Sequence, residues 1–186
     1  MTAPFASSHS NEWYTPDDVL EAERELFGGA PDLDPASCSE ANLRIGAARI
    51  YSPDCQQDGL LLPWEGKVHL NPPYGYREGR QSNQAVWIER AMRGWAMGEY
   101  DELVGVFAAR PGTRWYRWTQ MMCRCVLDER GSFVEPEARR LEREAAGKAY
   151  GGDTKGTVVV YMGWRWSSFA DAFGHLGEVF EPRRGR

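Results

Sequence analysis

The chain has 186 residues, of which 42% are hydrophobic and 26% charged, and its formal net charge at pH 7 is −5. This length fits one domain with a substantial core. No apolar run approaches the roughly 20 residues that a membrane-spanning helix needs, and a net acidic chain is not typical of nucleic-acid-binding proteins. The composition therefore predicts a single globular domain with no membrane partner.

The two ends of the chain differ in character from the middle. Residues 1–11 are small and polar and lack the basic-then-apolar pattern of a secretory signal, so we expect a flexible tail there and a cytoplasmic protein. Residues 182–186 form a short basic tail. A single domain is expected over residues 12–181.

Helical and strand patterns alternate along this domain. The helix expected over 17–27 has Pro16 near its start and Gly28-Gly29 at its end. The pattern then predicts strands over 32–34, 48–51, 67–71, 102–109, 123–127 and 157–162, and helices over 39–46, 84–97 and 113–121. The polar segment 129–153 is expected to form a loop with a solvated helical part.

This alternation predicts an α/β domain built on a largely parallel sheet flanked by helices. The unbroken apolar run at 103–107 is typical of a strand covered on both faces. Ligands of such sheets bind outside the carboxyl ends of the strands. Asp34 and Asn71 each end a predicted strand, so we expect both at that edge.

The tetrapeptide Asn71-Pro72-Pro73-Tyr74 has the chemistry of a site for an amine nucleophile. The side-chain oxygen of Asn71 and the main-chain carbonyl of Pro72 can each accept a hydrogen bond from one –NH2 group, which pulls its nitrogen toward sp³ and frees the lone pair. The two prolines fix the backbone without adding donors, and Tyr74 offers a flat face for stacking. The alternative is a strand-ending turn, which Asn and Pro also favour.

The cysteines and histidines do not indicate a metal site. No C-x-x-C pair occurs, and the three histidines are scattered. Cys123 and Cys125 lie two apart on a predicted strand, so they share one face and are not placed to bridge. We expect buried free thiols at the four positions, which are Cys38, Cys55, Cys123 and Cys125.

Arginines gather locally in this acidic chain. Arg77 and Arg80 follow the tetrapeptide, and Arg110, Arg114 and Arg117 follow the predicted strand 102–109. Net charge alone does not identify a partner, but a local basic face is compatible with the sequence.

Four motifs occur in a fixed order along the chain. They are Trp13-Tyr14-Thr15-Pro16, then Asp32-Leu33-Asp34-Pro35-Ala36-Ser37, then Asp58-Gly59-Leu60 with Pro63-Trp64, and finally Asn71-Pro72-Pro73-Tyr74-Gly75. This set resembles the signature of the phage Dam-type DNA N6-adenine methyltransferases over about residues 11–163. Asn-Pro-Pro-Tyr by itself is also found in methyltransferases that act on glutamine side chains and on RNA, so the ordered set is the more specific signal.

The resemblance implies a Rossmann-like class I methyltransferase fold that uses S-adenosylmethionine as methyl donor. It assigns catalysis to Asn71, Pro72, Pro73 and Tyr74. It assigns cofactor binding to Asp34, Pro35, Ala36 and Ser37 in the first loop, to Tyr14, Thr15 and Pro16 near the methionine end, and to Asp58 at the adenosine part. Two alternatives stay open, in which Asp34 caps the following helix and Asp58 only shapes a turn.

The sequence departs from the usual pattern of such enzymes in its first loop, which lacks Gly-x-Gly. No separate target-recognition domain is visible either, and a small recognition element is expected within 77–82 or 129–153. The residues expected to contact DNA are Arg77, Arg80, Arg110 and Arg114.

The function expected from the resemblance is methyl transfer to the N6 amine of adenine in double-stranded DNA, in the host cytoplasm if the protein is phage-encoded. An adenine inside a duplex must leave the base stack to reach such a site. Two alternatives are a methyltransferase for another amine, such as a protein glutamine or an RNA base, and a catalytically silent methyltransferase-like binder.

Overall fold

A computed structural model describes residues 13–77, 81–128, 133–148 and 156–182. The expected N-terminal tail and residues 183–186 of the expected basic tail lie outside the described residues.

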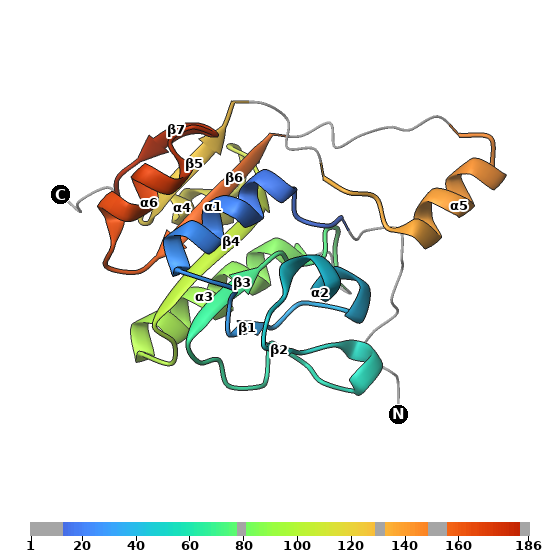
Figure 1. The fold of residues 1–186 in the computed structure, drawn as a ribbon, viewed down its shortest axis with the longest axis horizontal. Helices are drawn as coiled ribbons and strands as arrows, with labels where there is room; N and C mark the ends of the chain where they lie inside the picture. The colour runs from blue at the N-terminus through green and yellow to red at the C-terminus, as the bar shows by residue number, and fades with distance from the viewer. Residues whose placement is uncertain (1–12, 78–80, 129–132, 149–155, 183–186) are drawn as a thin grey trace.

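Seven strands form one sheet in the order β2–β1–β3–β4–β6–β5–β7 (Figure 1). The strands are β1 Leu33–Asp34, β2 Arg49–Ile50, β3 Lys67–Leu70, β4 Glu102–Ala108, β5 Cys123–Leu127, β6 Thr157–Met162 and β7 Gly177–Phe180. The helices are α1 Asp17–Phe27, α2 Ser39–Ile45, α3 Asn83–Met97, α4 Arg114–Thr119, α5 Glu137–Ala145 and α6 Trp166–Phe173, with a short 3₁₀ turn, η2, at Pro53–Cys55.

The sheet is mixed, although most of its strands run in one direction. Strands β2, β1, β3 and β4 pair in parallel, whereas β6 pairs antiparallel to both β4 and β5. Strand β5 therefore runs with β1–β4, and only β6 and β7 run the other way. The α/β class and the largely parallel sheet are confirmed, with the correction that β6 is inserted in reverse between β4 and β5.

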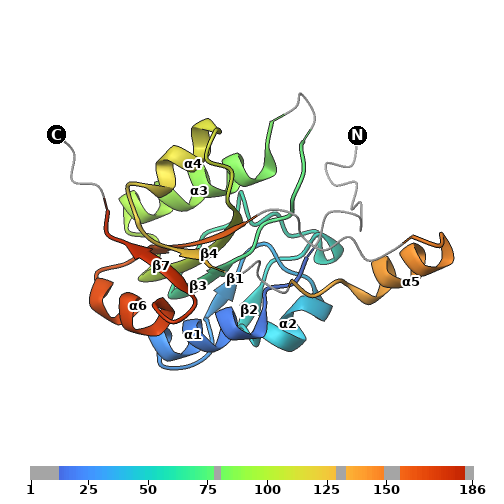
Figure 2. The same cartoon turned by 90° about the horizontal axis from the view of Figure 1, so that it is seen from above.

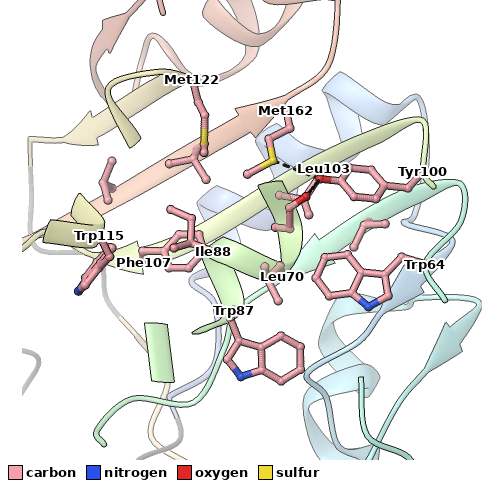
Figure 3. Close-up of a cluster of buried hydrophobic side chains, with 14 of the residues drawn as sticks. Trp64, Leu70, Trp87, Ile88, Tyr100, Leu103, Phe107, Trp115, Met122 and Met162 are labelled. Atoms are coloured by element: carbon pink, nitrogen blue, oxygen red, sulfur yellow. Dashed lines mark hydrogen bonds between the residues drawn. The ribbon is translucent and has the colours of Figure 1, made fainter. Parts of the chain in front are cut away.

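Helices cover both faces of the sheet (Figure 2). Successive side chains of a strand point to opposite faces, so β4 contributes Leu103 and Phe107 to the core under α3 and α4, and Val104 and Val106 to the core under α1 and α6. Figure 3 shows the first of these cores, in which the hydroxyl of Tyr100 donates a hydrogen bond to the carbonyl of Ala91.

The C-terminal part of the domain was only partly predicted. The sequence patterns above do not include α6 or β7, because α6 is a short helix of eight residues and β7 pairs along the edge of the sheet with half-exposed residues. The solvated helix expected within 129–153 is confirmed as α5, which has no buried residue and extends away from the sheet (Figures 1 and 2).

All four cysteines are free thiols. Cys123 and Cys125 are buried on one face of the sheet, as expected, but Cys38 is only partly buried and Cys55 is exposed, because it lies in the surface turn η2. Among the described residues no group of three or more His, Cys, Asp or Glu side chains could hold a metal ion. No helix in the described part of the chain is both long and apolar enough to cross a membrane.

Candidate active site at the carboxyl edge of the sheet

The chain changes direction across the sheet between β1 and β3. From β1 it passes through α2 to β2 on one side, and then crosses to β3 on the other side of β1. In open α/β sheets such a switch point is where ligands bind, outside the carboxyl ends of the two strands. Asp34 ends β1 and Asn71 directly follows β3, so the structure brings both predicted residues to this point.

The Asn71 side chain is fixed by both hydrogens of its amide nitrogen. The nitrogen donates to the main-chain carbonyl of Trp13 at 2.8 Å and to the hydroxyl of Thr15 at 3.0 Å. A carbonyl can only accept, so the contact with Trp13 decides which atom of the amide is the nitrogen. The Oδ1 atom of Asn71 is buried and has no hydrogen-bond partner in the described part of the structure. It is a preoriented acceptor.

The rest of the tetrapeptide is held by the start of α3. The Asn83 side chain donates to the carbonyl of Tyr74 at 3.2 Å, and the Asn83 main chain donates to the carbonyl of Gly75 at 3.1 Å. Pro72 is buried, and no described residue donates to its carbonyl. The half-buried ring of Tyr74 meets Phe133 edge-on, with ring centroids 6.1 Å apart. Two acceptors and an aromatic ring therefore stand next to one another on a braced loop.

A buried polar pair, which the sequence analysis did not single out, lies behind Asn71. His69 Nδ1 is 2.6 Å from Glu23 Oε2, and His69 Nε2 is 3.2 Å from the hydroxyl of Thr15. Glu23 comes from α1, and the side chains of Glu23 and His69 are 1% and 0% exposed. A signal for this pair was present in the sequence, since Glu23 falls on the apolar stripe of α1 and His69 stands inside the apolar run of β3.

The surroundings of this pair shift the pKa values of three groups. Burial raises the pKa of the Glu23 carboxyl above its ordinary 4.5 and that of Asp34 above its ordinary 3.8. Burial acts to lower the pKa of His69, but the charges of Glu23 and Asp34 outweigh that effect and leave the pKa of His69 above 6.5. The cluster therefore holds protons more tightly than the same groups would in water.

The first loop is shaped by the Asp34 side chain. Its carboxylate accepts a hydrogen bond from the main-chain N–H of Ala36 at 3.0 Å, and the residue is 2% exposed. The cap of α2 is Cys38, whose sulfur accepts from the N–H of Ala41, so Asp34 is not the helix cap. Asp34 instead stabilises the loop 34–37 through this hydrogen bond to Ala36. The sequence resemblance assigns cofactor binding to the same loop.

Asp58 forms a turn that packs on this loop. Its Oδ1 accepts from the N–H of Leu60 at 2.9 Å, as in the turn interpretation. Gly59 lies so close to the first loop that a β-carbon there would be 1.8 Å from the carbonyl oxygen of Pro35. The two predicted cofactor segments are therefore in contact, and the half-buried Asp58 lies beside the first loop.

The residues predicted near the methionine end lie in two different environments. The hydroxyl of Tyr14 is 3.8 Å from the Cys38 sulfur, and its main chain pairs with Val134. Burial raises the pKa of Tyr14 far above its ordinary value. Thr15 is 1% exposed and faces Asn71 and His69, while Pro16 is buried directly before α1. The structure thus places Thr15 behind the tetrapeptide.

Three of the four arginines predicted to contact DNA lie near the same edge of the sheet. Arg77 is half-buried just beyond the tetrapeptide, and Arg110 and Arg114 lie between the carboxyl end of β4 and the start of α4. Among the described residues neither Arg110 nor Arg114 has an acidic partner, whereas Arg44, Arg49, Arg90 and Arg165 are each paired with a carboxylate. Arg80 lies outside the described residues.

Comparisons of this chain with protein-family models, with curated proteins and with solved structures return no match. The assignment of the site therefore depends on its own residues and geometry.

Proposed function

We propose that this protein is an S-adenosylmethionine-dependent methyltransferase that methylates the N6 amine of adenine in DNA. The observation that carries the proposal is the buried Oδ1 of Asn71 at the switch point between β1 and β3, which has no hydrogen-bond partner among the described residues and is held in place by both hydrogens of its own amide. The sequence resemblance of the four ordered motifs supplies the substrate class.

The pair of acceptors favours an amine over other nucleophiles. The Asn71 oxygen and the Pro72 carbonyl together call for two hydrogens from the substrate, and an –NH2 group has two. A hydroxyl would satisfy only one of them and leave a desolvated acceptor without a partner, which costs about 1–3 kcal/mol. The two acceptors also act most strongly as positive charge develops on the nitrogen, which is where preorganised dipoles accelerate a reaction.

Tyr74 and the loop around it suit a planar substrate. A base that has left the duplex needs an aromatic or apolar surface to replace its lost stacking, and the half-buried ring of Tyr74 follows the two acceptors directly. No general base is required in this scheme, because the amine loses its proton only after its nitrogen has become positive.

The first loop and its neighbour fit the donor. S-adenosylmethionine, when bound, supplies a methyl group attached to a positively charged sulfur. Asp58 would provide a carboxylate for the donor, and the loop 34–37 its main-chain groups. Asp34 would shape that loop from inside, through its bond to the N–H of Ala36.

DNA would approach over Arg110 and Arg114, for which no acidic partner is found in the described part of the chain. Arg110 and Arg114 stand above the carboxyl end of β4, next to β3, and are available for phosphate contacts. A protein with net charge −5 would depend on such a local patch, and its affinity for DNA should fall with added salt.

The proposal is tested by expressing the protein in a bacterial host that lacks N6-adenine methylation and measuring N6-methyladenine in the digested DNA by mass spectrometry. This readout does not require the recognition sequence to be known. We expect N6-methyladenine with the parent protein and much less of it with Asn71→Ala at equal expression. A melting-temperature rise with S-adenosylmethionine or its demethylated product checks the cofactor separately. Methylation of RNA or protein but not DNA would favour another amine, and no methyl transfer with no melting shift would leave the proposal without support.

A further inference from the structure

A continuous polar chain runs from α1 through the interior to the candidate catalytic amide. It passes from Glu23 to His69 at 2.6 Å, from His69 to Thr15 at 3.2 Å, and from Thr15 to Asn71 at 3.0 Å. Three separate segments of the polypeptide contribute side chains to it: α1, the segment before α1, and β3 with the loop that follows. Its outer end is Asn71, whose Oδ1 accepts no hydrogen bond from any described residue.

The inner end of this chain is costly to bury. Glu23 and His69 are almost fully excluded from solvent, and the Oε1 atom of Glu23 has no partner among the described residues. Buried ionisable pairs of this kind add little to stability compared with apolar side chains of similar volume. Packing alone therefore does not explain why β3, whose Val68 and Leu70 pack in the apolar core on the other face of the sheet, has a buried histidine next to the tetrapeptide.

The direction of the hydrogen bonds connects the pair to Asn71. The Asn71 amide donates to the Thr15 oxygen, so the Thr15 hydroxyl hydrogen is available for His69 Nε2, and His69 Nδ1–H then donates to Glu23. If His69 binds a second proton, Nε2 becomes a donor and Thr15 receives hydrogens from both sides. In each protonation state of His69, the hydroxyl of Thr15 is the group through which His69 acts on Asn71.

We propose that Thr15 and His69, supported by Glu23, are positioning residues that hold the Asn71 amide with its oxygen toward the substrate amine. This inference rests on the proposed function of the same edge. Of the two hydrogen bonds that orient the Asn71 amide, the one that it donates to the Trp13 carbonyl goes to the main chain and is independent of side-chain identity. The one that it donates to the Thr15 hydroxyl can be removed by a side-chain substitution.

The main test compares Thr15→Val with Thr15→Ser. Valine keeps the volume and removes the hydroxyl, whereas serine keeps the hydroxyl. We expect Thr15→Val to lower kcat about 10- to 100-fold with little change in KM or in cofactor affinity, since supporting contacts and small misplacements have effects of this size. Thr15→Ser should recover most of kcat. Equal kcat in Thr15→Val and the parent would overturn the inference.

Thr119→Val is the matched control. Thr119 is also a fully buried threonine, but its hydroxyl bonds to the carbonyl of Tyr116 within α4. We expect Thr119→Val to lower the melting temperature. Its kcat should fall much less than that of Thr15→Val. A loss of kcat of similar size in Thr119→Val would show that any buried hydroxyl loss has this effect, and would overturn the inference.

A second measurement uses the parent protein and requires no activity. The charged or titratable groups that face His69 are Glu23 and Arg24 on α1 and Asp34 on β1. In an NMR titration, the side-chain amide protons of Asn71 should shift with the same midpoint as the ring of His69, and this common shift should be absent in Thr15→Val. Asn71 amide signals that do not shift with the titration of His69 would overturn the inference, and this result can be obtained even if Thr15→Val does not fold. Failure of the proposed function would instead show as a parent protein that transfers no methyl group, with the coupled titration intact.

Discussion

Gly59 lies against the main chain of Pro35, at a separation where a β-carbon would come within 1.8 Å of the Pro35 carbonyl oxygen. This close approach is the reason for a glycine here. The backbone of Gly59 is not in the left-handed region, so its conformation does not require one. The contact joins the turn at Asp58 to the loop after β1, two segments that are 24 residues apart in the sequence and that together form the proposed cofactor site.

The first prediction tests this contact. Gly59→Ala should push the two loops apart, lower the free energy of unfolding by about 1–3 kcal/mol, and weaken the melting-temperature rise caused by S-adenosylmethionine. The matched control is Gly112→Ala, because a β-carbon at Gly112 meets nothing within 4 Å. Both effects are measured by thermal unfolding of the two variants with and without the cofactor. If both variants respond to the cofactor like the parent, the Gly59 contact does not shape the cofactor site.

The second prediction separates catalysis from folding at Asn71. Asn71→Ala removes an acceptor that acts mainly in the transition state, so turnover should fall on the order of 10²–10³ while cofactor affinity stays close to that of the parent. Methyl incorporation and melting temperature are measured on the same preparations. A folded, cofactor-binding Asn71→Ala that methylates DNA at the parent rate would contradict the mechanism.

The third prediction concerns the ring of Tyr74. Tyr74→Ala should weaken substrate capture by roughly 1–3 kcal/mol of stacking and raise KM for DNA. Tyr74→Phe and Tyr74→Trp keep a flat face and should retain much of the activity. Because Tyr74 also contacts Phe133, melting temperatures are needed to separate lost stacking from lost packing. Equal loss of activity in Tyr74→Phe and Tyr74→Ala would exclude a stacking role.

The fourth prediction follows from the buried cluster of Glu23, His69 and Asp34. All three pKa values are raised on folding, so this cluster binds more protons in the folded than in the unfolded protein and its contribution to stability falls as pH rises. The contribution of His69 is complete below pH 6.5 and is lost as the pH rises through its folded pKa. We expect the melting temperature to decline above pH 6.5, and His69→Gln to flatten this decline. The exposed His175 provides the control, since His175→Gln should leave the decline unchanged.

The fifth prediction addresses DNA binding. Replacing Arg110 and Arg114 together by Glu should weaken DNA binding and reduce its salt dependence, because each lost phosphate contact lowers the salt slope by about one. Cofactor binding should be retained. Arg93→Glu is the control, because Arg93 is exposed on α3 and is not among the arginines at the carboxyl edge. An unchanged DNA affinity in the double variant would place the contact surface elsewhere.

The elements with local signals could be predicted from the residue pattern alone. The helix over Asp17–Phe27 follows from its apolar spacing and the glycine after it, and the buried strand Glu102–Ala108 from its unbroken apolar run. The same patterns predicted that Asp34 and Asn71 each lie at the end of a strand. These properties depend on residues close together in the chain, so the pattern of residues is sufficient to predict them.

The contacts between residues far apart in the chain could not be predicted in this way and are known from the fold. The reversal of β6 and its place between β4 and β5 depend on strand pairing across long separations, which no local pattern encodes. Likewise, Thr15 looked like a cofactor residue by its motif, and His69 like one of three scattered histidines. The packing of α1 on β3 buries Glu23 beside His69 and brings Thr15 against Asn71. Burying a polar group without a hydrogen bond costs free energy, and the fold determines which partner is within reach.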